Sequence, residues 1–410
     1  MTNRLSRGVR SFVTACVLLV LTAIAAEIGL RIKDDYKTAT ASPVELAERL
    51  TVPCWRTVRT LRPLAERETL DPDRGVRITV RINSLGLRGE EPQIPKSPGT
   101  FRILLLGDET FFGPYLAEAD TVAARLESLL GSRTDLQVEV VNAAVPGDCP
   151  LLSTLRVKGT LLSLDPDLIV QHFDISDIAE SAEYRRRTRL DEAGRALACP
   201  SATLESGRHL LWFEELKLTA AATSMLSRFF EPPATDAEPN RSMGLSWPDD
   251  PAQGELIRLE QALAPLTELR QIADGTYSKF LVSTCPQPWQ VSPTASSGPS
   301  VREAAGVQAG QHYLSRSVFD RVAAYTTEHS IAWCDAVPYF EDYSAPDVLF
   351  FKNSVGLSPR GAELYARVLA KRIMEETPYV WRKVSGPGEN IPRAADRRAE
   401  THSHDGTWFE

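Results

Sequence analysis

The stretch from Phe101 to Gly113 constrains the fold most, because a continuous apolar run ends there in a turn that carries two acidic residues. Residues Ile103 to Leu106 are too uniformly apolar for a half-exposed strand, which predicts a central parallel strand covered on both faces. Gly107 then permits a tight turn at the carboxyl end of this strand, where open α/β sheets place their ligands. Because Asp108 and Glu109 follow directly, we expect a site at this turn.

The rest of the chain alternates strands, loops and helices, the pattern of a parallel sheet between helix layers. It predicts an α/β fold, a flavodoxin-like three-layer sandwich with a parallel sheet of about five strands. Pro265 is expected to kink or divide one of the helices. Beyond the first strand, strands are predicted at 137–141, 167–173, 279–285 and 331–337, and helices at 121–130, 151–162, 255–273, 315–328 and 359–376.

Composition shifts divide the chain further. A polar stalk and lead-in, including an edge strand at 76–83, precedes the α/β domain, and a cap-like insertion interrupts that domain. The C-terminal stretch is charged, punctuated by Pro and Gly and poor in apolar residues, which predicts disorder. The predicted segments are 1–33 as membrane anchor or signal segment, 34–100 as stalk and lead-in, 101–180 and 252–382 as the α/β domain, 181–251 as the insertion, and 383–410 as the tail.

The amino terminus predicts export. Arg4, Arg7 and Arg10 precede the apolar stretch from Ser11 to Leu30, which carries charge only at Glu27, and roughly 20 apolar residues span a bilayer. Arginines before such a stretch favour a cytoplasmic amino terminus. We therefore expect a membrane helix and an extracytoplasmic domain, in a bacterial periplasm or at the cell surface. Two alternatives are cleavage of a signal peptide near Ala23–Ala25 and lipidation at Cys16.

Charge and cysteine content exclude two classes of function. A net charge of −8 leaves no basic footprint for nucleic acid. No Cys-x-x-Cys or His-x-x-x-His motif occurs, so neither a structural metal site nor a cofactor is predicted. An odd number of cysteines follows the N-terminal segment, so the sequence does not predict their pairing: Cys54, Cys149, Cys199, Cys285 and Cys334.

Two motifs together resemble a known family. The run Asn83-Ser84-Leu85-Gly86-Leu87-Arg88-Gly89 is followed by Gly107-Asp108-Glu109. This resembles the SGNH/GDSL hydrolases, specifically a membrane-anchored bacterial branch that opens on Asn-Ser-x-Gly-x-Arg-Gly and continues into Gly-Asp-Ser. The resemblance covers 81–173 well and 279–372 more loosely. It implies an esterase site built from a nucleophile, oxyanion donors, a base and an orienting carboxylate.

The residues that carry catalysis in this family are replaced here. Glu109 stands at the serine position, while Gly147 matches the oxyanion-hole glycine and Ser176 takes the place of the oxyanion asparagine. In the last motif, Asn353 and Gly356 stand at the aspartate and histidine positions. Losing one triad member costs about 10⁴ to 10⁶ in turnover, so the resemblance implies a catalytically degenerate member.

The leading hypothesis is a membrane-anchored, extracytoplasmic SGNH-like protein without ester hydrolysis. Its remnant pocket is expected to bind glycan or acyl-ester-like ligands at the cell surface, as the family implies. The residues expected to line this remnant pocket are Asp108, Glu109, Thr110, Asn142, Gly147, Ser176, Asp177, Lys352, Asn353 and Ser354.

Two other hypotheses remain open. One is an active esterase or acyl transferase whose nucleophile has moved to Thr110, Ser176 or Ser354, with His172 or His209 as the base. The other is a metal-assisted hydrolase built on carboxylates, for which spacing places no histidine ligand. Its residues would be Asp108, Glu109 and Asp177.

Overall fold

The computed structural model describes residues 18, 21–27, 50–205, 251–299 and 301–381. Its centre is a five-stranded parallel sheet with the order β11-β10-β7-β5-β6. Counted along the chain, this is the flavodoxin-like order 2-1-3-4-5. The predicted α/β fold with about five parallel strands is therefore confirmed. The strands are β5 (Thr100–Leu106), β6 (Gln137–Asn142), β7 (Leu168–Phe173), β10 (Lys279–Thr284) and β11 (Ala332–Asp335).

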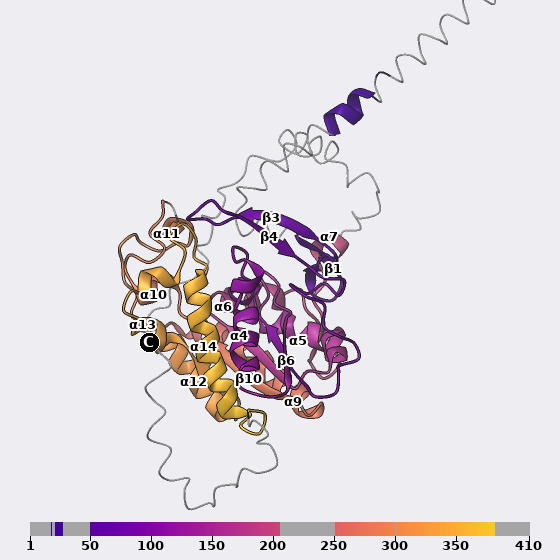
Figure 1. Cartoon of the computed structure of the whole chain (residues 1–410), viewed down its shortest axis with the longest axis vertical. Coiled ribbons are helices and arrows are strands. Elements are labelled where there is room, and N and C mark those ends of the chain that lie inside the picture. The colour runs from indigo at the N-terminus through magenta and orange to yellow at the C-terminus, as the bar shows by residue number, and fades with distance from the viewer. Residues whose placement is uncertain (1–17, 19–20, 28–49, 206–250, 300, 382–410) are drawn as a thin grey trace, which may run out of the picture.

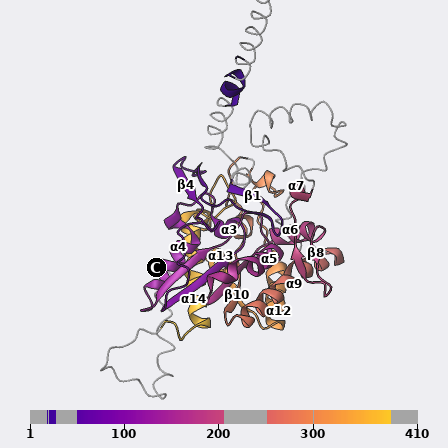
Figure 2. The same cartoon turned by 90° about the vertical axis from the view of Figure 1, so that its right-hand side faces the viewer.

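Helices cover both faces of this sheet. On one face α4 (Val122–Gly131) packs beside α14 (Pro359–Glu376) over Ile103 and Leu105 of β5 (Figure 1). Leu104 and Leu106 of β5 point to the opposite face, as alternation along a strand requires. The helices on that face lie across the sheet from α4 and α14 (Figure 2). Every residue of β5 is buried, as the apolar run predicts. The helices of the second face include α5 (Pro150–Gly159), α9 (Gln253–Gly275) and α12 (Ser317–Glu328).

Short helices complete the α/β domain, and Pro265 does not divide α9. Helix α9 runs through Pro265 without a break, so the predicted division is wrong. Its neighbours Leu263 and Leu266 are buried, and this packing holds the helix together at the proline. The short elements are α3 (Glu109–Phe112), α10 (Pro288–Val291), α11 (Val301–Ala304), α13 (Val337–Glu341) and three 3₁₀ turns, η1 (Glu118–Asp120), η2 (Leu161–Leu164) and η5 (Pro346–Leu349).

The lead-in forms two antiparallel hairpins outside the main sheet. β1 (Thr51–Cys54) pairs with β2 (Val58–Leu61), and β3 (Glu66–Leu70) with β4 (Arg77–Arg81). The segment predicted as stalk and lead-in therefore contains a hairpin at residues 51–61. The predicted edge strand at 76–83 is a strand, β4, which pairs with β3 and not with the main sheet. Arginines of β4 form ion pairs with glutamates of β3 across the hairpin.

Both hairpins reach the end of the sheet that carries the predicted site. Asp73, in the turn between β3 and β4, accepts hydrogen bonds from the amides of Lys352 (2.8 Å) and Asn353 (2.9 Å). On β2, the Arg59 guanidinium lies so close to Gly147 that a Cβ there would sit 3.2 Å from its Nη1. The lead-in thus covers the carboxyl ends of the parallel strands.

The first residues of the predicted insertion form regular secondary structure. Helix α6 (Ser176–Arg185) runs past residue 181, so the strand–helix alternation does not fail there. It is followed by the small hairpin β8 (Arg189–Leu190) and β9 (Ala196–Ala198), and by α7 (Ala202–Glu205). The Cys199 backbone exchanges hydrogen bonds with Arg56 and Val58, so this part packs on the β1–β2 hairpin. Residues 206–250, with His209, lie outside the described residues.

Most of the predicted N-terminal anchor also lies outside the described residues. Residues 18 and 21–27 are helical. In the ranges that the structure describes, no helix combines the length and the apolar character needed to cross a bilayer. The predicted C-terminal tail, 383–410, falls outside these ranges as well.

Candidate functional site

The site lies where β5 and β7 end side by side. Between these two strands the connections turn in opposite directions, and such a switch point is where open α/β sheets bind ligands. Gly107 ends β5 with φ of +151°, and a Cβ at this position would lie 2.8 Å from Cβ of His172. Only glycine fits such a close approach.

Asp108 starts the short helix α3. Its Oδ1 accepts the Thr110 amide hydrogen at 3.0 Å, an N-cap bond, and Gly113 closes the helix in the left-handed conformation. Asp108 is buried, and burial, reinforced by the charges of Asp174 and Glu109, raises its pKa well above the usual range.

The lead-in motif from Asn83 to Gly89 supports this turn. Arg88 is buried and donates hydrogen bonds to the carbonyls of Phe112, Gly113 and Leu116 at the end of α3. Burial lowers the pKa of Arg88 to about 10. Asn83 Oδ1 accepts the amides of Leu85 and Leu87 and shapes the loop before it.

Glu109 occupies the expected nucleophile position and fills the expected oxyanion site. Its Oε2 accepts a hydrogen bond from the backbone amide of Gly147 at 3.2 Å. Burial raises the pKa of Glu109, and the positive charge of Arg59 opposes that rise. Arg59 is a site residue that the sequence did not indicate, because only the folded hairpin brings it here.

The hydroxyl and the amide of Ser176 are both already bonded, so neither is free to stabilise an oxyanion. Ser176 Oγ donates to Asp174 Oδ1 at 2.6 Å, and its amide donates to the same oxygen at 2.7 Å. Gln287 Nε2 donates to the other Asp174 oxygen at 3.0 Å. Ser176 therefore positions the carboxylate of Asp174.

The last motif is split between the pocket and the surface. Lys352 and Asn353 are exposed, and Asn353 Nδ2 donates to the Pro72 carbonyl and to Asp73 Oδ1, both at 3.1 Å. Gly356, at the histidine position, lines the same pocket as Glu109 at the serine position. The structure thus brings the matched serine and histidine positions together, but turns the aspartate position away.

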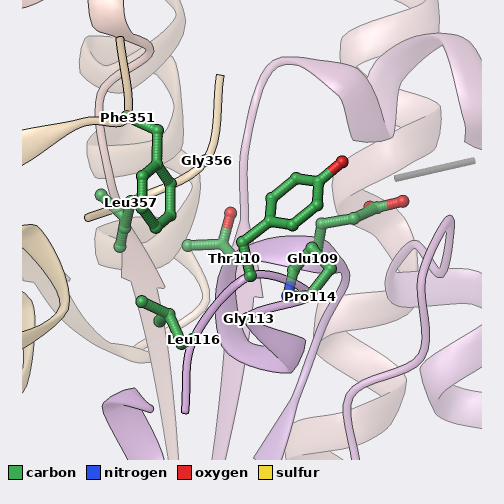
Figure 3. A pocket seen from close by; sticks show the side chains of 9 residues that line it. Glu109, Thr110, Gly113, Pro114, Leu116, Phe351, Gly356 and Leu357 are labelled. Atoms are coloured by element: carbon green, nitrogen blue, oxygen red, sulfur yellow. The ribbon is translucent and has the colours of Figure 1, made fainter. Parts of the chain in front are cut away.

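This pocket is small. It holds about 10 Å³ of free volume, roughly the space of one water molecule. Figure 3 shows Glu109 and Thr110 on one side of it and Phe351, Gly356 and Leu357 on the other.

The other predicted pocket residues serve the framework. Asn142 donates to the Phe111 carbonyl at 2.8 Å and accepts the Ala144 amide. Asp177 is buried and accepts the Asp174 amide at 2.9 Å. Ser354 Oγ accepts the Gly356 amide at 3.3 Å. Of the ten residues expected to line the pocket, Glu109 and Thr110 line this cavity.

The imidazole of His172 contacts a phenol instead of a candidate nucleophile. Its Nδ1 lies 2.9 Å from Tyr365 Oη, which donates to Ser283 Oγ at 2.8 Å. All three residues are buried, and burial raises the pKa of Tyr365 well above its ordinary value. Within the described ranges, no hydrogen bond joins His172 to Thr110, Ser176 or Ser354, the positions considered for a relocated nucleophile.

Three side chains at the switch point place potential metal-ligand atoms close together. One donor atom from each of Asp108, His172 and Asp174 lies within 4.8 Å of the others, and all three residues are buried. This set shares Asp108 with the carboxylates considered from the sequence, but it contains His172 and Asp174 in place of Glu109 and Asp177. A signal for it was available, because positions 172 and 174 at a strand end point to the same side.

No family model matches the chain, and no curated protein matches its sequence. Solved structures do resemble it. A lipase/acylhydrolase from Enterococcus faecalis is 13% identical, with 67% of this chain and 96% of that chain covered and a TM-score of 0.37. A putative lipolytic protein of the G-D-S-L family from Desulfitobacterium hafniense is 11% identical, with 66% and 98% covered and a TM-score of 0.34.

A third structure, a catalytic mutant of an acetylxylan esterase from Geobacillus stearothermophilus, is 12% identical, with 67% and 94% covered and a TM-score of 0.35. The names of all three describe lipolytic or ester-hydrolysing proteins.

Proposed function

We propose that this protein is an SGNH/GDSL-like module that does not hydrolyse esters by the serine mechanism. One observation carries the proposal: the carboxylate of Glu109 stands at the nucleophile position and accepts the Gly147 amide, the donor that an oxyanion would need. A negatively charged tetrahedral intermediate would have to compete with a carboxylate for that donor.

The hydrogen bonds of the neighbouring residues support the same proposal. Ser176 donates its hydroxyl to Asp174, so the second candidate oxyanion donor is occupied as well. Gly356 provides no base, and Asn353 is bound to the hairpin turn at Pro72 and Asp73. The imidazole of His172, considered as a base from the sequence, forms a hydrogen bond with Tyr365.

The cellular role follows from the sequence as part of this proposal. The arginines and the apolar stretch at the amino terminus favour anchoring in a membrane, with the α/β domain outside the cytoplasm. Glycan or acyl-ester-like ligands would bind at the strand ends. Since the pocket holds about 10 Å³, such binding requires the loop from Phe351 to Leu357 to move away from α3.

The test is activity-based labelling of the purified full chain. We expect no labelling by a serine-directed fluorophosphonate and no turnover of p-nitrophenyl acetate above buffer. The matched controls are Thr110→Ala and Ser354→Ala, which remove two of the hydroxyls considered for a relocated nucleophile. Stoichiometric labelling of the wild type, or turnover that either variant abolishes, would overturn the proposal in favour of a relocated nucleophile.

A further inference from the structure

We propose that Asp108, His172 and Asp174 form a binding site for one divalent transition-metal ion, of the Zn²⁺ or Mn²⁺ class, at the switch point between β5 and β7. The site is independent of the proposed loss of ester hydrolysis, because none of the three residues stands at a position of the family triad. It differs from a surface acidic cluster in its burial, with exposed fractions of 5%, 2% and 5%.

The spacing of the donor atoms fits one ion. All three lie within 4.8 Å of one another. Two ligands at about 2.1 Å from a metal are separated by about 3.0 Å when adjacent and about 4.2 Å when opposite. Small side-chain rotations would therefore close the set around one ion. The three donors come from the ends of two adjacent parallel strands, so the sheet itself fixes their relative positions.

His172 is arranged as a metal ligand is. Tyr365 Oη donates its hydrogen to Ser283, so it accepts the hydrogen of His172 Nδ1 at 2.9 Å. That assignment leaves a lone pair on Nε2, which is buried and has no hydrogen-bond partner. A histidine ligand usually donates its other ring N–H in this way, which fixes its tautomer and orientation. A buried acceptor without a partner is costly unless something fills the position.

The charges around the three residues also call for a cation. Within the described residues, no lysine or arginine forms an ion pair with Asp108 or Asp174, and the neighbouring Asp177 is buried too. One Asp174 oxygen accepts two bonds from Ser176 and the other one bond from Gln287, whereas Asp108 accepts at Oδ1. Lone pairs therefore remain on both carboxylates for an ion.

The donor set selects the class of metal. One imidazole nitrogen with two carboxylates suits Zn²⁺ and Mn²⁺, whereas Mg²⁺ and Ca²⁺ prefer oxygen ligands alone. No thiolate belongs to the set, which disfavours sites selective for soft ions. Three protein ligands leave coordination positions open for water.

The test uses the untagged full chain, stripped with EDTA and then titrated with ZnCl₂ or MnCl₂ by isothermal calorimetry, with the bound metal counted by mass spectrometry. We expect one ion per chain and an increase in Tm. Asp174→Asn and His172→Gln should weaken binding at least about 100-fold. Glu180→Gln, which changes a nearby carboxylate outside the set, should alter affinity by less than about threefold. MgCl₂ at the same concentration should bind at least about 100-fold more weakly.

Two further variants keep the test decisive. The double variant His402→Ala/His404→Ala removes the histidines of the C-terminal segment and should leave the bound ion in place. Tyr365→Phe removes the acceptor for His172 Nδ1, and as a positioning change it should weaken affinity about 10-fold while the site stays intact.

If the ligand variants fail to fold, X-ray absorption at the zinc edge of the wild type decides. We expect a first shell of nitrogen and oxygen only, with the outer-shell scattering of one imidazole. The proposal is overturned by an unoccupied wild type, by sulfur ligands, or by binding that the C-terminal double variant abolishes and Asp174→Asn leaves unchanged. Detectable fluorophosphonate labelling would contradict the proposed function and leave this metal site standing.

Discussion

Glu109 Oε2 accepts the backbone amide hydrogen of Gly147 at 3.2 Å, so the residue at the nucleophile position occupies the donor that would stabilise an oxyanion. The two residues are far apart in sequence and meet because β5 and β6 are adjacent parallel strands. This one hydrogen bond therefore joins the position expected to attack the ester and the amide expected to stabilise the oxyanion. It also indicates which changes would release the amide.

The first prediction concerns the pair of positions that face the pocket. Glu109→Ser frees the Gly147 amide, and Gly356→His adds a base across the same pocket. A Cβ at Gly356 would make only ordinary contacts, the closest at 3.7 Å to Ser354 Oγ, so a side chain fits there. We expect the double variant to hydrolyse p-nitrophenyl acetate about 100-fold faster than Glu109→Ser alone, the usual contribution of a general base. Equal rates for the two variants would mean that position 356 does not face position 109.

A second prediction tests the role of the lead-in motif. Arg88 donates to three carbonyls at the end of α3, and its side chain is completely buried. Arg88→Leu leaves those carbonyls without their donor, so we expect the free energy of unfolding to fall by at least about 3 kcal/mol. Urea unfolding measures it. The control Arg77→Leu removes an exposed ion pair with Glu68 and should cost less than about 1 kcal/mol.

The sequence predicts the sheet well because its evidence is local. The apolar run of Ile103–Leu106 needs cover on both faces, and the motif after it marks the carboxyl edge. The two hairpins were harder to predict. The alternating pattern of β4 indicates an edge strand, but it does not show that its partner is β3 and not the main sheet. The site depends on tertiary contacts: Arg59 and Glu109 meet only after the hairpin docks, and Asp108 joins His172 only because β5 lies beside β7.

A third prediction uses cysteine reactivity. Burial alone would raise the pKa of Cys54, but hydrogen bonds from Thr57 and Arg56 and the charge of Arg156 bring it below its ordinary value. Burial raises the pKa of Cys149 and Cys285 well above the usual range and that of Cys334 to about 12. We expect iodoacetamide at pH 7.5 to alkylate Cys54 at least about 10-fold faster than these three, because the thiolate is the nucleophile. Peptide mass spectrometry reads the rates, and in urea the difference should disappear. Native-state alkylation of Cys285 as fast as that of Cys54 would contradict the packing.

The last prediction concerns the pH dependence of stability and Glu180, in the middle of α6. Glu180 Oε2 is buried without a hydrogen-bond partner, and burial, with the charges of Glu109 and Asp108, raises its pKa well above its ordinary value. A carboxyl group with a raised pKa stabilises the fold below its unfolded-state pKa, about 4.3, and this contribution is lost as the pH rises through the folded-state pKa. Glu180→Gln cannot ionise, so we expect it to raise the free energy of unfolding by about 1 kcal/mol at pH 8 and to change it little at pH 4.

Urea unfolding in EDTA at both pH values measures this difference, with Glu183→Gln as the matched control. Glu183 lies on the same helix with its side chain 68% exposed and paired with Arg187, so its replacement should bring no gain that depends on pH. An equal shift for Glu180→Gln at pH 4 and pH 8 would mean that this carboxyl is ionised in the folded protein at little cost. The pKa of Glu180 would then lie near its ordinary value, and solvent would balance its negative charge.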